Sequence, residues 1–167
     1  VEDYTNGTIK KHEGTIKKRE QLFETYLKTT GFNAEPVLLT YKDDKKFNTL
    51  LQTLKKKRPE YEFSTTDKKL HRLWLVNDKE NIKKIISFFE NKEALYIADG
   101  HHRSASSSLL KKDLQSENIH HKGDENYNFF MSYIIPESNL KISEFNRFIK
   151  DLNGLSIDEF LIKLDKN

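Results

Sequence analysis

Apolar residues recur at spacings of three and four along several stretches of the chain, which is the period of an amphipathic helix. In the first stretch, Leu22, Phe23, Tyr26 and Leu27 share one apolar face, which predicts a helix over residues 13–30. Further helices are expected around these apolar sets: Phe47, Leu50, Leu51 and Leu54; Ile82, Ile85, Ile86 and Phe89, capped by Asp78; Ala105, Leu109, Leu110 and Leu114; and Phe160, Leu161 and Leu164, capped by Ser156.

Short runs of strand-forming residues lie between these helices. Residues 37–41 and 94–98 are mostly apolar and predict buried strands, whereas 60–66 and 69–76 alternate and predict two strands around a turn at Asp67-Lys68. Two more strands are expected at 129–135 and 140–142, with a turn at Asn6-Gly7 and a polar loop over 115–127. Because strands and helices do not alternate strictly, the pattern favours an α+β fold, a mixed sheet with flanking helices, over a doubly wound sheet.

The length of 167 residues fits one domain, so we expect a single α+β domain over residues 1–167. The chain begins with Val1 in sequence that resembles the middle of a protein, which suggests a fragment of a longer chain. Residues 1–15 are then a lead-in from an N-terminal part, and residues 128–167 the start of a C-terminal subdomain.

Composition narrows the classes of function. The chain is 35% hydrophobic and 33% charged, with a net charge of +3, which gives no general case for binding nucleic acid or a membrane surface. The one dense basic run, residues 55–58, is expected to be a solvated helix end. The absence of cysteine excludes disulfides, and no apolar run approaches the roughly 18 residues that cross a bilayer, so a cytoplasmic location is expected.

The segment at residues 95–104 carries the most chemistry. A buried strand leads into Asp99-Gly100-His101-His102-Arg103-Ser104, and a helix follows. Such a strand–turn–helix junction presents unpaired backbone N–H groups and the positive end of the helix dipole, which predicts a phosphate site. Gly100 allows the sharp turn, and the guanidinium of Arg103 suits bidentate phosphate contact.

Other groups at this junction have several possible roles. His101 and His102 can donate to phosphate oxygens, carry a proton or bind metal. Asp99 can cap the helix, orient a histidine or ligate Mg²⁺. A purely structural cluster is the alternative, although burying an aspartate, two histidines and an arginine unused would be costly.

Two further segments are candidates. In Lys11-His12-Glu13-Gly14-Thr15, Glu13 either caps the following helix or acts as a general base, with His12 or Lys18 as a phosphate contact. His71 is either a site residue or an ordinary strand residue, and Arg147 is a further phosphate-contact candidate. Other polar or aromatic groups are assigned to structure: Trp74 to the core, and His120 and His121 to a solvated loop.

These motifs together resemble the bacterial and archaeal family known as domain of unknown function 1015. The resemblance rests on residues 95–103, on Lys11-His12-Glu13 with Thr15, on His71 with Trp74, and on Phe145-Asn146-Arg147 followed by residues 151–154. Two positions depart from the family pattern, since the Lys17-Lys18-Arg19 segment lacks an aspartate and Ser104 replaces an aromatic residue.

The Asp-Gly-His-His-Arg element is also similar to the signature of the ParB/sulfiredoxin-like superfamily, which includes CTP-binding partition proteins, ATP-using sulfiredoxins and free-serine kinases. The resemblance implies a ParB/sulfiredoxin-like core and a bound nucleotide phosphate, with ATP or ADP and Mg²⁺ as expected cofactors. It points to serine metabolism: a nucleotide-dependent phosphotransferase acting on a small hydroxyl substrate such as serine or phosphoserine.

Alternatives from other classes stay open: a phosphoserine phosphatase, or a nucleotide-binding regulatory module without turnover. A third is a scaffold whose active residues lie elsewhere in a longer chain. A nucleic-acid or membrane partner is not expected, and the sequence leaves the oligomeric state open.

Overall fold

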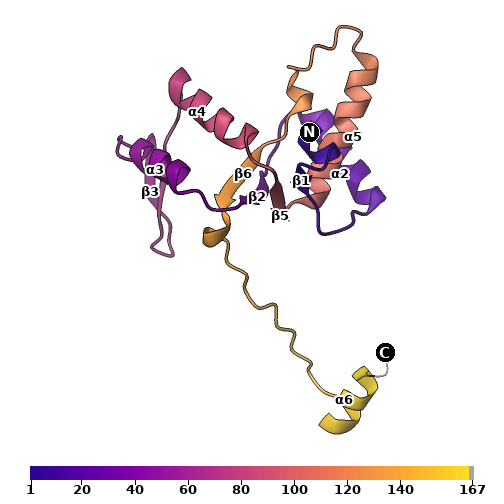
Figure 1. Ribbon diagram of the computed structural model, residues 1–167. Helices are drawn as coiled ribbons and strands as arrows, with labels where there is room; N and C mark the ends of the chain where they lie inside the picture. Colours follow the sequence, from indigo (N-terminus) through magenta and orange to yellow (C-terminus); the bar gives the residue numbers. More distant parts are fainter. Residues whose placement is uncertain (166–167) are drawn as a thin grey trace.

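The computed structural model describes residues 1–165 and is built around a four-stranded mixed sheet (Figure 1). Its strands are β1 (Ile9–Lys10), β5 (Leu95–Asp99), β2 (Val37–Tyr41) and β6 (Ser132–Pro136), in that spatial order. β1 runs parallel to β5 and β6 runs parallel to β2, whereas β2 and β5 are antiparallel. The predicted α+β class with a mixed sheet is therefore confirmed.

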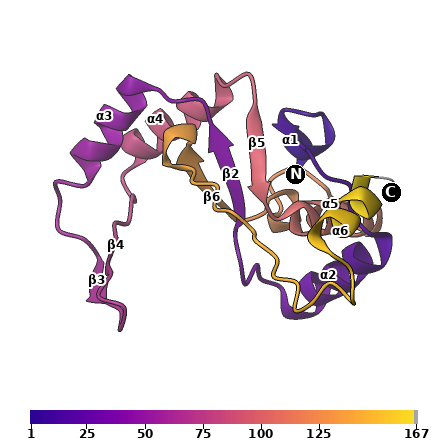
Figure 2. The same cartoon turned by 90° about the horizontal axis from the view of Figure 1, so that it is seen from below.

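Helices lie on both sides of this sheet, as Figure 2 shows from below. The helices are α1 (Glu2–Thr5), α2 (Lys17–Thr30), α3 (Lys45–Leu54), α4 (Lys79–Glu90), α5 (His101–Glu117) and α6 (Ile157–Asp165), with 3-10 turns η1 (Asn126–Asn128) and η2 (Glu137–Asn139). α1, α2 and α5 gather at one side and α3 and α4 at the other. No helix within residues 1–165 combines the length and apolar character that crossing a membrane requires.

The main core lies between the sheet and the α1–α5 side. Its buried members come from β1, β2, β5 and from the two helices: Tyr4, Ile9, Val37, Leu39, Ile97 and Ala105. α5 contributes small residues here, because Ser104, Ser106 and Ser107 are buried and their hydroxyls donate to carbonyls one turn back. These short side chains allow α5 to pack closely while their polar groups stay satisfied.

An aromatic cluster joins α3 and α4 to the end of β2. Tyr41 is 1% exposed and lies edge-on to Phe47 and Phe88, whose rings stack 3.7 Å apart. Asp44 caps α3 by accepting from the Phe47 amide at 3.0 Å, and Asp78 caps α4 as predicted.

Two parts stand apart from the sheet. The predicted hairpin is present as β3 (Tyr61–Ser64) and β4 (Leu70–Leu73), which pair antiparallel with exposed side chains. Residues 141–149 extend away from β6, and α6 lies beyond them (Figure 1). Ser156 and Glu159 form the reciprocal capping bonds that start α6, as the sequence predicted.

Some predicted elements were wrong or displaced. Residues 140–142 form no strand, because they have no neighbouring strand to bond with, and β6 begins at Ser132 rather than at 129. α5 continues through Glu117, which shortens the predicted loop. His121 is half-buried against the Tyr127 hydroxyl at 2.8 Å rather than solvated, whereas His120 is exposed as expected.

Candidate functional site

The junction between β5 and α5 has the predicted strand–turn–helix form. Gly100 is the N-cap of α5 and has φ +101°, the left-handed region that glycine tolerates best. No side chain caps the helix, and the first intrahelical bond runs from the Ser104 amide to the Gly100 carbonyl at 3.0 Å. The amides of His101, His102 and Arg103 therefore have no partner within the helix.

Arg103 folds back over this turn. Its Nη2 donates to Asp99 Oδ2 at 2.7 Å, and its Nη1 pairs with Glu35. A Cβ built on Gly100 would lie 3.0 Å from Arg103 Nε and Nη2, so the absence of a side chain at Gly100 makes room for the guanidinium. The Nε of Arg103 is buried and has no hydrogen-bond partner, which leaves one strong donor of this group unused.

Two histidines attach the loop at residues 12–16 to the first turn of α5. Nε2 of His101 accepts from the His12 amide at 3.4 Å, and Nε2 of His102 accepts from the Ile16 amide at 3.1 Å. An imidazole nitrogen that accepts a hydrogen bond carries no proton, so in this arrangement the His101 ring is neutral with its proton on Nδ1. For His101, burial lowers the pKa and repulsion from His12 lowers it further, which agrees with a neutral ring.

Glu13 lies beside the imidazoles of His12 and His101. Its Oε2 is 3.7 Å from His101 Nδ1 and its Oε1 is 3.7 Å from His12 Nε2, distances too long for hydrogen bonds. The Glu13 side chain is 64% exposed. The carboxylate thus keeps free lone pairs at the surface, which a general base requires.

The capping alternative for Glu13 is wrong. α2 starts at Lys17 rather than at residue 13, and its N-cap, Ile16, makes no side-chain bond to the helix. Thr15 instead donates to Glu20. Glu13 therefore has no structural task in starting the helix.

Donor atoms of His12, Glu13 and His101 all lie within 4.8 Å of one another; because Nδ1 of His101 carries its proton, a divalent cation here would bind to Glu13 and His12. The sequence suggested Asp99 as the metal ligand, but Asp99 is paired with Arg103. Asp99 also makes no cap to α5. A cation would have to compete with the guanidinium for this carboxylate, and it would meet no such competitor at Glu13.

The remaining sequence candidates lie elsewhere. Ser104 is fully buried and its hydroxyl donates to Gly100, so it faces the core. His71 stacks on Phe63 in the β3–β4 hairpin, and Arg147 contacts the Phe145 ring in the extended tail (Figure 1). The structure does not bring His71 or Arg147 to the α5 junction, and the Ser104 hydroxyl there is already used.

Trp74 is only half-buried, outside the main core, and its indole donates to the Lys57 carbonyl at 2.8 Å. The basic run at residues 55–58 is exposed directly after the end of α3, as predicted.

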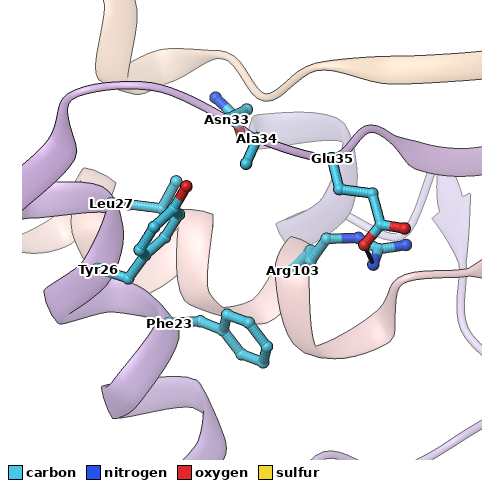
Figure 3. Close-up of a pocket in the computed structure, with 7 residues that line it drawn as sticks. All are labelled: Phe23, Tyr26, Leu27, Asn33, Ala34, Glu35 and Arg103. Carbon is cyan, nitrogen blue, oxygen red and sulfur yellow. Dashed lines mark hydrogen bonds and ion pairs between the residues drawn. The ribbon is translucent and has the colours of Figure 1, made fainter.

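A pocket adjoins Arg103 on the side of α2. The cavity measures about 180 Å³. Figure 3 shows the residues that line it: Phe23, Tyr26, Leu27, Asn33, Ala34, Glu35 and Arg103. The helical pattern of Phe23, Tyr26 and Leu27 is typical of a core face. The structure instead buries no residue of α2.

Glu35 and Ile16 were not anticipated at all. Glu35 sits in a short polar stretch before β2, and Ile16 acts through its backbone amide, so neither leaves a local signal.

Comparison with known proteins assigns the chain to a family. The family described as "Protein of unknown function (DUF1015)" matches residues 1–167. The chain belongs to the DUF1015 family. No curated protein and no solved structure matched it. In this DUF1015 protein, two motifs that carried the resemblance, Lys11-His12-Glu13 and residues 99–103, meet in one place.

Proposed function

We propose that this DUF1015 protein is a nucleotide-dependent phosphotransferase that acts on a small hydroxyl substrate such as serine or phosphoserine, with its site at the amino end of α5. One observation carries the proposal. The His101 and His102 bonds to the loop at residues 12–16 bring an exposed carboxylate, Glu13, beside His101 at the uncapped N-terminus of α5, the helix that also carries Arg103 in its first turn.

The residues present fit a phosphate group. Free amides at the start of α5 and the adjacent guanidinium are the donors that bind phosphate oxygens in proteins. The unpaired Nε of Arg103, which lies against Gly100, agrees with a ligand completing this arrangement. The similarity of residues 99–103 to the ParB/sulfiredoxin-like signature supports the same conclusion.

Charge balance adds a requirement for a cation. Glu35 and Asp99 pair with Arg103, whereas Glu13 lies beside His101, which is neutral, so the near surroundings carry more negative than positive charge. A phosphate would be repelled unless a divalent ion entered with it, which favours Mg²⁺–ATP or Mg²⁺–ADP as the ligand. Glu13 or Asp99 would hold the ion, which neutralises phosphate charge.

In the proposed reaction the terminal phosphoryl group passes from the nucleotide to the substrate hydroxyl. Glu13 takes the hydroxyl proton, the new phosphoester forms, and the shortened nucleotide leaves. Arg103 and the amides of His101 and His102 hold the phosphate oxygens. The Nδ1–H of His101 lies 3.7 Å from the Glu13 carboxylate, and its Nε2 holds the loop that carries Glu13 through the His12 amide, so His101 is a positioning residue.

The test is phosphate transfer from labelled ATP or ADP to serine by the protein and by Arg103→Ala, His102→Ala and Glu13→Gln. Arg103→Ala removes a charge-stabilising group and should lower turnover about 10²–10³-fold. Glu13→Gln should lower turnover by removing the base, and His102→Ala by releasing the loop that carries Glu13. His120→Ala, at an exposed position away from the site, is the matched control. Unchanged turnover in both Arg103→Ala and His102→Ala would reject the assignment.

The alternatives give different products in the same assay. Nucleotide binding without transfer would indicate a regulatory module. Release of inorganic phosphate from labelled phosphoserine would indicate a phosphatase.

A further inference from the structure

Aromatic side chains on α2 lie open beside the proposed phosphate site. Phe23 is 40% exposed and Tyr26 is 36% exposed, although their helical spacing is typical of a buried face. They line the 180 Å³ pocket together with Leu27, opposite the segment at residues 33–35 (Figure 3). Tyr26 lies edge-on to Phe32 with ring centroids 6.3 Å apart, and the parts of Phe23 and Tyr26 that stay exposed are suited to stacking on a flat ring.

The pocket is connected to the phosphate site through one residue. Arg103 lines the pocket and also pairs with Asp99 at the start of α5. Glu35, which pairs with Arg103, stands at the same end and is 69% exposed. From the pocket toward the start of α5, a ligand would contact first the apolar aromatic wall, then the Glu35 carboxylate, and then the Arg103 guanidinium with the free helix amides.

The size of the pocket limits what can enter. Sites for whole drug-sized ligands measure roughly 300–1,000 Å³, so a cavity of about 180 Å³ takes only one part of such a molecule. Its mostly apolar aromatic wall favours the ring end of that molecule, and the charged end must then lie outside, toward Arg103.

We propose that this pocket holds the purine base of the nucleotide, with the base against Phe23 and Tyr26, the ribose hydroxyls donating to Glu35, and the phosphates at Arg103. A carboxylate that accepts from ribose hydroxyls is a known device of nucleotide sites. This inference rests on the proposed function, since it assigns the base of the same ligand.

The experiment compares two probes by calorimetry in Mg²⁺ buffer: ADP and inorganic pyrophosphate. The wild-type protein should bind ADP about 5- to 150-fold more tightly than pyrophosphate, the range expected for one stacked base. Phe23→Ala and Tyr26→Ala should each remove most of this preference and change pyrophosphate affinity less than twofold. Leu22→Ala is the matched control, because Leu22 is 69% exposed on the same helix and lies outside the pocket lining.

The outcomes separate the two proposals. If pyrophosphate binds and ADP binds no better, the base pocket is wrong while the phosphate site stands. If Phe23→Ala loses both probes equally, the residue supports the fold rather than the base, which also overturns the inference. If neither probe binds, the proposed function falls and the base pocket falls with it.

A second measurement uses the unaltered protein, so its result does not depend on whether the variants fold correctly. Photolabelling with 2-azido-ADP should attach within residues 23–35, and excess ADP should prevent it. Labelling confined to other segments would contradict the pocket assignment.

Discussion

The Nε2 atom of His102 accepts a hydrogen bond from the backbone amide of Ile16 at 3.1 Å, across 86 positions of the sequence. Together with a second bond of the same kind, from the His12 amide to His101 Nε2, it fixes the loop that carries Glu13 against α5. A residue that resembles a phosphate contact in the sequence therefore also acts as an anchor for the loop.

Replacing His102 by alanine should release this loop. We expect the free energy of unfolding to fall by about 0.5–1.5 kcal/mol, the net value of one hydrogen bond, and toward the lower end because the ring is half-exposed. Hydrogen exchange at the Ile16 amide should become faster in the variant. Wild-type exchange rates at Ile16 would contradict the anchor, and His120→Ala supplies the comparison.

Gly100 should not tolerate a side chain. In Gly100→Ala, the left-handed backbone costs about 1–2 kcal/mol, and the new Cβ would meet Arg103 Nε and Nη2 at 3.0 Å. Urea denaturation should show this loss, and phosphate binding should weaken because the guanidinium moves. Gly14→Ala is a suitable control, since a Cβ there meets nothing within 4 Å. Equal stability of the two variants would refute the strain.

The stabilisation that the ionised Glu125 gives to the loop before η1 should persist to low pH. Burial opposes ionisation of Glu125, but amide N–H groups of Lys122 and Gly123 and the nearby His121 outweigh it, and the pKa of Glu125 is lowered to about 2. Because folding lowers this pKa from 4.5, the stabilisation is complete above about pH 4.5 and is lost as the pH falls through about 2.

Urea midpoints measured between pH 5 and pH 2 test this linkage. The stability advantage of the wild type over Glu125→Gln should be greatest at pH 5 and should shrink steadily toward pH 2. An advantage that grows on acidification would have the wrong sign for a lowered pKa.

Glu13→Gln should weaken the Mg²⁺ dependence of ADP binding more than Asp99→Asn does. The Asp99 carboxylate is already paired with Arg103 at 2.7 Å, whereas Glu13 has no hydrogen-bond donor in the part of the chain described. Titration of ADP at several Mg²⁺ concentrations gives the comparison. A larger effect in Asp99→Asn would contradict this prediction and would indicate that Asp99, the ligand first suggested by the sequence, holds the ion.

Elements that depend mainly on residues close together in the sequence could be predicted from it. The buried strands β2 and β5 and the capped helix α4 follow from apolar runs, periodicity and Asp78. The two-residue strand β1 was missed because it exists only through pairing of Ile9 with Leu95, far along the chain. The strand expected at 140–142 had suitable residues but no partner.

The candidate site likewise has one part that the local sequence predicts and another that depends on contacts distant along the chain. The strand–turn–helix around Gly100 is contiguous and could be predicted, but its carboxylate partner Glu35 depends on where the chain passes before β2. Phe23 and Tyr26 were identified as an apolar face, yet periodicity does not distinguish a face that packs in a core from one that lines a pocket.

The long separation between His102 and Ile16 has a consequence for biosynthesis. At roughly 5–20 residues per second, the ribosome delivers the second half of the site about 4–17 s after the first. Throughout that interval the nascent segment carrying Glu13 has neither its imidazole anchors nor its β5 neighbour. The loop that carries Glu13 can therefore take its place against the sheet and α5 only after the first turn of α5 has emerged from the ribosome.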